Sequence, residues 1–109
     1  MKTDLIEIFQ TIRASMQPYA ALGFDNRTSS ETVYDLWSNK NVTIEGEQWN
    51  EVFFASVVIE NDAVIFSLLP EQLKGEKKQL KELDDAVLVA IEDALAAAFK
   101  EFKEKDWVV

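Results

Sequence analysis

Two apolar runs on either side of Asn61 and Asp62 constrain this sequence more than any other feature. Both runs are rich in Val, Ile and Phe, the residue types that suit the pleated, packed surface of a β-sheet. Asn and Asp tolerate a positive φ better than most other residues with a side chain, so a tight turn can join the two runs. The stretch from Glu51 to Leu69 therefore predicts a β-hairpin.

The turn of this hairpin sets which side chains share a face. A two-residue loop pairs Val57 with Phe66, and a four-residue loop would keep the same two faces. The first face is then entirely apolar and consists of Phe53, Ala55, Val57, Ile59, Val64, Phe66 and Leu68. The second face is mixed and consists of Phe54, Ser56, Val58, Glu60, Ala63, Ile65, Ser67 and Leu69. A hairpin alone cannot bury the first face, so helices must cover it.

The two ends of the chain supply these helices. From Thr3 to Met16, apolar residues repeat at helical spacing, Asp4 can cap the first turn, and Pro18 predicts the end of the helix. Residues 85–104 have the same periodicity, and Asp84 can cap their first turn. We expect both helices to place their apolar stripes on the hairpin.

The segments between these elements are shorter. Residues 17–31 are rich in turn-forming types and predict a connector, or a connector that contains one short helical turn around Tyr19 to Leu22. Residues 32–38 and 42–44 predict two further strands. Residues 70–75 predict a short helical turn that starts at a proline. Residues 77–83 fit an edge strand or the start of a helix, and periodicity does not decide between the two.

Length and composition favour a single domain. A chain of 109 residues, 48% of them hydrophobic, buries about 65% of its unfolded surface. No apolar run reaches the roughly 18–20 residues of a membrane span, and the N-terminal segment lacks the pattern of a signal peptide. We expect a cytoplasmic α+β domain over residues 1–109, with an antiparallel meander of about four strands. The N-terminal helix and the long C-terminal helix would pack on it in a two-layer sandwich.

Charge and residue usage exclude several function classes. The net charge is −9, and no Lys or Arg occurs between Asn41 and Leu73. The resulting negative electrostatic potential disfavours binding of nucleic acids and anionic membranes, so we expect neither as a partner. The chain has no Cys and no His, which excludes disulfides, thiolate catalysis and any histidine-based acid–base mechanism.

The second hairpin face is the candidate functional surface, because it is too apolar for a freely solvated sheet. Nearby aromatic residues could extend it, although aromatic residues beside a sheet more often belong to a core or a subunit interface. The candidate ligand or interface residues are Trp37, Trp49, Phe54, Val58, Ile65 and Leu69. Our first hypothesis is a non-enzymatic binding module that uses this surface for a protein partner, for self-association or for a small apolar ligand.

Carboxylates are the only candidate metal ligands or acid–base groups. They gather at the last helix, at Asp84, Asp85, Glu92 and Asp93. Oxygen ligands of this kind can hold hard cations or iron, but the same residues fit a capped helix start and a solvated helix face. Iron binding is the second hypothesis, and otherwise no cofactor is expected. A carboxylate-based enzyme is the third hypothesis, and no activating partner for it is visible in the sequence.

The order of elements resembles that of a known family. It is carried by YDLW at 34–37, FFASVVIENDAVIFSLLP at 53–70 and GEKKQLKELDD at 75–85. This pattern is similar to the small bacterial YdhG-like proteins of the domain-of-unknown-function 1801 family, over about Leu5 to Phe102. The family's Trp-Gly-x-Pro-like segment has no counterpart in 24–30.

The resemblance implies an α+β sandwich. In one branch of the family it also implies a frataxin-like iron chaperone. The acidic residues of the last helix named above would then carry the iron.

Overall fold

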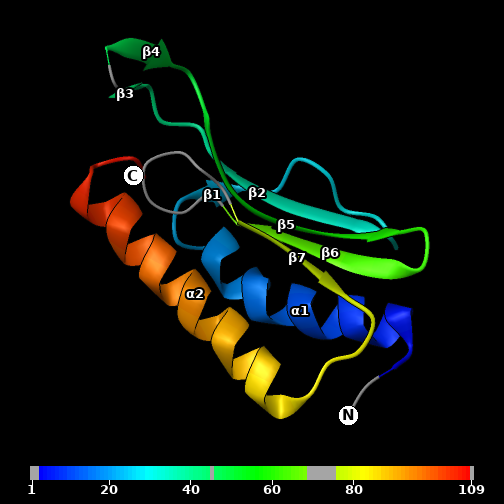
Figure 1. Ribbon diagram of the computed structural model, residues 1–109. Coiled ribbons are helices and arrows are strands. Elements are labelled where there is room, and N and C mark those ends of the chain that lie inside the picture. The colour runs from blue at the N-terminus through cyan, green and yellow to red at the C-terminus, as the bar shows by residue number, and fades with distance from the viewer. Residues whose placement is uncertain (1–2, 45, 69–75, 109) are drawn as a thin grey trace.

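The structure is a computed structural model that describes residues 3–44, 46–68 and 76–108. Both of its helices pack on one face of an antiparallel sheet (Figure 1), so the predicted α+β class is confirmed. Along the chain the elements are α1 (Leu5–Ala20), β1 (Phe24–Asp25), β2 (Val33–Ser38), β3 (Val42–Ile44), β4 (Glu47–Trp49), β5 (Val52–Glu60), β6 (Ala63–Leu68), β7 (Glu76–Leu80) and α2 (Asp85–Glu104).

The β5–β6 hairpin forms the centre of the main sheet, whose strand order is β1-β2-β5-β6-β7. Its register pairs Val57 with Phe66 and Glu60 with Ala63, so the predicted two-residue turn is confirmed. Asn61 adopts a φ of 56° at this turn, in the left-handed region that Asn tolerates better than most residues. The turn residues therefore set the pairing of the two longest apolar runs in the chain.

A β-bulge in β5 changes the face of two residues. Leu36 pairs with Ala55, but the next residue of β2, Trp37, pairs with Phe53, so Phe54 is an extra residue in β5. Such an extra residue breaks the alternation of side chains along the strand. Phe54 is fully buried beneath the helices and Phe53 is only partly buried. Our assignment of Phe53 to the covered face and Phe54 to the open face is therefore wrong.

The segment 42–44 does not return to the main sheet as a meander strand. β3 pairs with β4, with Val42 opposite Trp49, and forms a separate two-stranded hairpin. We call this hairpin, residues 42–49, the arm; it projects beyond the end of the main sheet (Figure 1). Strands β2 and β5 pair directly across its base, where Ser38 lies opposite Val52.

The segment 77–83 contains an edge strand and no helix start. β7 pairs with β6, with Ile65 opposite Gln79. The predicted helical turn at 70–75 lies outside the described residues. The main sheet thus has five strands instead of the four of the predicted meander, and the arm is an addition to it.

Helix α1 extends four residues past its predicted end at Met16. Its first turn is capped as predicted, because the Asp4 side chain accepts a hydrogen bond from the Ile6 amide at 2.9 Å. Pro18 lies inside the last turn, where its fixed φ suits a helix although its missing N–H removes one hydrogen bond. Tyr19 stabilises this turn by packing 5.6 Å from the Phe54 ring, measured between ring centroids.

Aromatic rings join the sheet to α2 at the base of the arm. Phe24 stacks on Phe54 with a centroid distance of 4.1 Å, and Phe102 meets Phe54 edge-on at 5.3 Å. After α2 the chain folds back, so that Trp107 packs on Phe102 at 5.3 Å. The buried Ser38 hydroxyl donates a hydrogen bond to the Trp107 carbonyl oxygen at 2.5 Å, which ties the end of the chain to β2.

Candidate functional site

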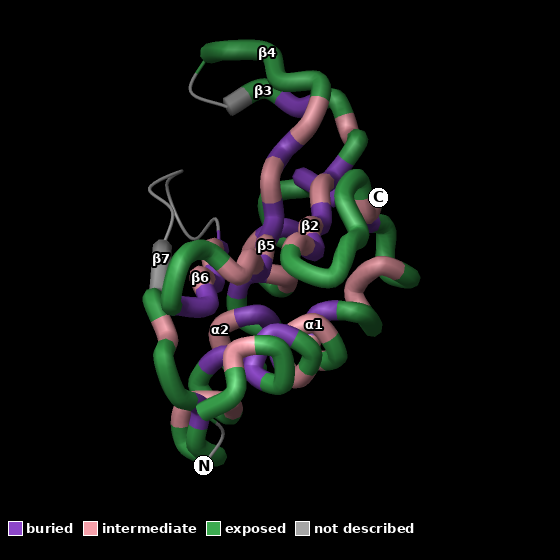
Figure 2. The backbone as a smooth tube through the Cα atoms, turned by 90° about the vertical axis from the view of Figure 1, so that its right-hand side faces the viewer, coloured by how far each residue is buried: buried purple, intermediate pink, exposed green. Residues whose placement is uncertain are grey.

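The face of the main sheet turned away from the helices is the largest surface that the sheet leaves open. We call it the outer face; its described residues are Asp25, Val33, Asp35, Trp37, Phe53, Ser56, Val58, Glu60, Ala63, Ile65, Ser67 and Gln79. Along β2, and along β6 from Val64 to Leu68, partly buried outer residues alternate with buried inner ones (Figure 2). The sheet thus has one closed face and one face that its own helices do not cover.

An apolar row crosses the middle of the outer face. Val33 of β2 pairs with Val58 of β5, which pairs in turn with Ile65 of β6. All three side chains are partly buried, since neighbouring strands flank them. The next row contains Asp35, Ser56 and Ser67, so a band of small polar residues borders the apolar row.

Trp37 and Phe53 form an aromatic corner at the end of this face near the arm. Their ring centroids lie 5.2 Å apart in an edge-to-face arrangement. The guanidinium of Arg27 stacks over the Trp37 ring at 4.9 Å and forms ion pairs with Glu51 and, at 3.7 Å, with Asp25. The indole Nε1 of Trp37 is buried and has no hydrogen-bond partner among the described residues.

The loop that carries Arg27 is anchored to β2. The Asp35 carboxylate accepts hydrogen bonds from the backbone amides of Arg27 and Thr28 at 2.9 and 2.8 Å. The Asn26 side-chain amide donates to the Asp35 carbonyl oxygen at 2.7 Å. Asp35, the acid in the middle of the outer face, is therefore already occupied by local hydrogen bonds. The other described acids of this face are Asp25 and Glu60.

The structure separates the residues that the sequence predicted as one surface. Trp37, Val58 and Ile65 lie on the outer face, but Phe54 belongs to the core because of the bulge. Trp49 lies on the arm, where 37% of it is exposed. Leu69 lies outside the described residues.

Val33 and Phe53 lie on the outer face, Arg27 lies beside it, and none of the three was among the predicted site residues. The alternation in 32–38 already places Val33 beside Trp37, so this signal was available. Phe53 was hidden by the bulge. Arg27 had no local signal, because it reaches Trp37 from a separate loop.

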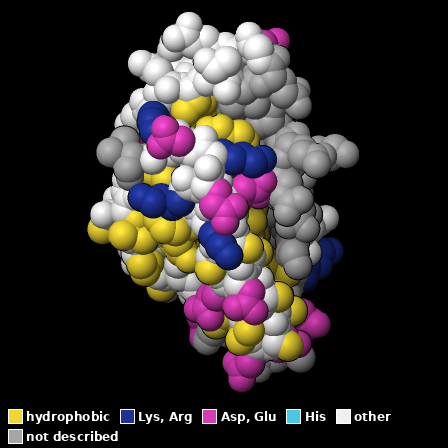
Figure 3. Space-filling view, turned by 90° about the vertical axis from the view of Figure 1, so that its left-hand side faces the viewer, with side chains coloured by type: hydrophobic (Ala, Val, Ile, Leu, Met, Phe, Trp, Pro, Cys, Tyr) yellow, Lys and Arg dark blue, Asp and Glu magenta, His cyan; other side chains and the backbone are white. Residues whose placement is uncertain are grey.

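The acidic residues predicted as metal ligands, Asp84, Asp85, Glu92 and Asp93, do not gather in one cluster with a third ligand. Asp84 caps the helix by accepting a hydrogen bond from the Val87 amide at 2.8 Å, and Glu92 accepts one from the Ser15 hydroxyl at 3.0 Å. Asp85 and Asp93 are exposed. Within residues 3–44, 46–68 and 76–108, no three Asp, Glu, His or Cys side chains gather closely enough to hold a metal ion. On the face shown in Figure 3, acidic side chains are interspersed with basic and hydrophobic ones.

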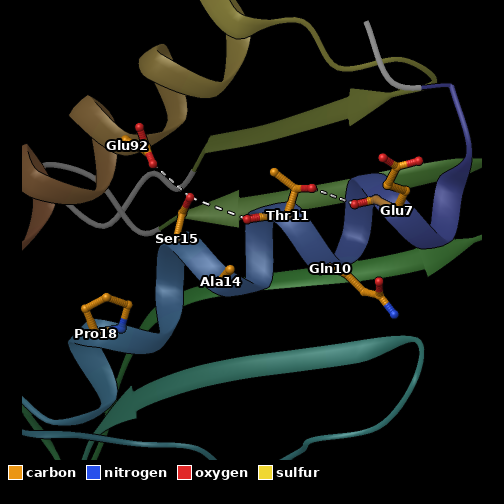
Figure 4. A pocket seen from close by; sticks show the side chains of 7 residues that line it. All are labelled: Glu7, Gln10, Thr11, Ala14, Ser15, Pro18 and Glu92. Carbon is orange, nitrogen blue, oxygen red and sulfur yellow. Dashed lines mark hydrogen bonds between the residues drawn. The ribbon is translucent and has the colours of Figure 1, made fainter.

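A shallow groove of about 600 Å³ runs between the two helices (Figure 4). Its lining consists of Glu7, Gln10, Thr11, Ala14, Ser15, Pro18 and Glu92. Within α1, the Thr11 hydroxyl donates a hydrogen bond to the Glu7 carbonyl oxygen at 2.8 Å, and the Ser15 hydroxyl lies 3.4 Å from the Thr11 carbonyl oxygen. Burial raises the pKa of the nearby Tyr19, and the negative charge of Glu92 raises it further. The hydrogen bond between Ser15 and Glu92 joins the two helices. An activated serine nucleophile requires a base that a third group holds in place, and this pair does not have that geometry.

Comparison with known proteins gives no assignment. No described helix is long and apolar enough to cross a membrane. Searches against protein-family models, curated proteins and solved structures found no match to this chain. The likeness to the YdhG-like family therefore stays a prediction.

Proposed function

We propose that this chain is a self-associating interaction module whose outer sheet face is covered by a second copy. The observation that carries the proposal is the apolar row of Val33, Val58 and Ile65, continued by the Trp37–Phe53 corner, on a face turned away from both helices. Two such faces would pack sheet on sheet, as the layers of a β-sandwich do at a spacing of about 10 Å.

The charge distribution favours a second copy as the occupant. The chain carries a net charge of −9, which opposes close approach of two copies over most of their surface. On the outer face, Asp35 is held by two backbone amides and Asp25 is paired with Arg27. Glu60, the third described acid of this face, is the last residue of β5 and lies beside the turn. Ser56 and Ser67 are small, so they permit the close approach that face-to-face packing requires.

The aromatic corner would supply the anchor of the interface. Trp and Arg are enriched among the residues that dominate binding energy, and here Arg27 stacks on Trp37. A buried donor without a partner costs about 1–3 kcal/mol, and Trp37 Nε1 is such a donor among the described residues. A second copy that displaces the Arg27 side chain would supply an acceptor and remove this cost.

Sedimentation velocity over a range of protein concentrations tests the proposal. The wild type should form a dimer, and moderate salt should strengthen the dimer because it screens the repulsion between two acidic chains. Ile65→Glu or Val58→Glu should abolish the dimer, because the new carboxylates would face each other in an apolar interface.

Val89→Glu is the matched control. Val89 is also an apolar residue, but it lies on α2 and is 52% exposed. This variant should dimerise as the wild type does. A monomeric wild type at all concentrations, or a dimer that survives both outer-face substitutions, would refute the proposal.

A further inference from the structure

A second hollow, of about 390 Å³, lies between α1 and the loop that leads into β2. Its lining consists of Ile6, Gln10, Arg13, Glu31 and Thr32. The three helical residues are spaced four and three apart, so they form one stripe along α1. This hollow shares no residue with the outer face, and it shares only Gln10 with the groove between the helices.

Arg13 is the cation of this hollow and has no ion-pair partner among the described residues. Its guanidinium carbon lies 5.5 Å from the centre of the Phe9 ring, and the side chain is partly buried. The other described arginine, Arg27, is paired with two carboxylates. Because a partly buried charge is costly when it is unpaired, Arg13 is the group in this hollow that an anion would stabilise.

The guanidinium also acts on Tyr34, which lies in the core with 5% of its surface exposed. Burial raises the pKa of Tyr34, and the positive charge of Arg13 lowers it in opposition. The Arg13 charge is therefore close enough to Tyr34 to act on it.

The walls of the hollow are held in place by independent contacts. On the helix side, Phe9 and Ile12 are fully buried and fix the orientation of α1. On the loop side, the Thr32 carbonyl oxygen accepts a hydrogen bond from the Ile59 amide at 2.8 Å, and the Ser30 hydroxyl oxygen accepts one from the Thr32 amide at 3.2 Å. A ligand would thus enter a largely formed site, as small-molecule sites usually are.

From this geometry we propose that the hollow binds a small monocarboxylate with a short aliphatic body. The guanidinium of Arg13 offers a carboxylate two parallel donors. Ile6, which is 58% exposed, would cover the aliphatic body. The Glu31 carboxylate at the rim would repel a second negative charge, so a monoanion should bind better than a dianion of the same length.

An NMR titration of the isotope-labelled protein tests the site with hexanoate and, for comparison, the dicarboxylate adipate. Hexanoate should shift the amide signals of Ile6, Gln10 and Thr32 and the Arg13 Nε–H signal, with saturation in the millimolar range. Adipate should bind at least threefold more weakly. Arg13→Gln should weaken hexanoate binding at least tenfold, and Glu31→Gln should remove most of the preference for hexanoate.

Lys100→Gln is the control for a general loss of positive charge, because Lys100 is an exposed cation on α2. It should leave hexanoate affinity within twofold of the wild type. Amide spectra of each variant establish that the fold is kept. Equal affinity of the wild type and Arg13→Gln, or shifts confined to other surfaces, would overturn the proposal. Val58→Glu should not change the titration, so this site and the proposed dimer can fail independently.

Discussion

The two faces of the main sheet both carry apolar side chains but have opposite surroundings. The inner face lies under α1 and α2, and residues such as Phe54, Val57 and Val64 have no exposed surface. The outer face carries Val33, Val58 and Ile65 in a row, all partly buried. Apolar character therefore identified the covered face of the hairpin except at Phe53 and Phe54, where the bulge in β5 decides.

The neighbours Phe53 and Phe54 give the most direct test of this difference. Phe54→Ala should lower the free energy of unfolding by about 3–5 kcal/mol, because it leaves a cavity among packed rings. Phe53→Ala should cost about 1 kcal/mol, because only part of its surface and one edge-to-face contact are lost. Urea denaturation followed by circular dichroism measures both. Equal costs would mean that the bulge does not place Phe54 inside.

Serine residues on the two faces allow the stability effect of losing a hydroxyl group to be compared between the covered face and the open face. Ser38→Ala should destabilise the protein by about 1–3 kcal/mol, because the buried Trp107 carbonyl oxygen would lose its hydrogen-bond donor. Ser67→Ala, on the outer face, should change stability by less than about 0.5 kcal/mol. Thermal unfolding of the two variants provides the readout. A neutral Ser38→Ala would show that the end of the chain is not held by this contact.

The third and smallest effect concerns pH. Burial raises the pKa of both Tyr19 and Tyr34 above their usual value of 10.0, so between that value and the folded-state pKa the native state binds more protons than the unfolded state. Stability contributed by the neutral phenols is complete below about pH 10 and falls as pH rises further. Denaturation curves between pH 8 and pH 11 should show this loss, since these conditions span the onset of phenol ionisation.

Tyr19→Phe and Tyr34→Phe together provide the control, because they remove every tyrosine in the chain. The double variant should lose less stability than the wild type over the same range of pH. An identical slope in both proteins would show that the phenols do not contribute.

Much of the fold could be predicted because its signals are local. The turn at Asn61 set the register of β5 and β6 through the alternation of the flanking residues, and Asp4 and Asp84 marked the starts of both helices. The α+β class followed, since the apolar hairpin face required cover. Each of these inferences depends on residues that lie a few positions apart.

The errors arose where the deciding contact is distant in sequence. The run Phe53-Phe54-Ala55 is apolar throughout, so nothing in it marks the bulge, which is fixed by pairing with Leu36 and Trp37. Arg13 was likewise invisible as a candidate. Its position in the helical pattern indicates only partial exposure. The other wall of the hollow is formed by Glu31 and Thr32, which are distant from Arg13 in the sequence.

The arm described above has a practical consequence for engineering. It makes the molecule long, with extents of 42 × 25 × 23 Å, yet it leaves and rejoins the main sheet at Ser38 and Val52, which face each other on paired strands. Exposed tips with closely spaced ends tolerate inserted or replaced sequence well. Residues 43–49 are thus a natural place to graft a foreign peptide or a fluorescent reporter.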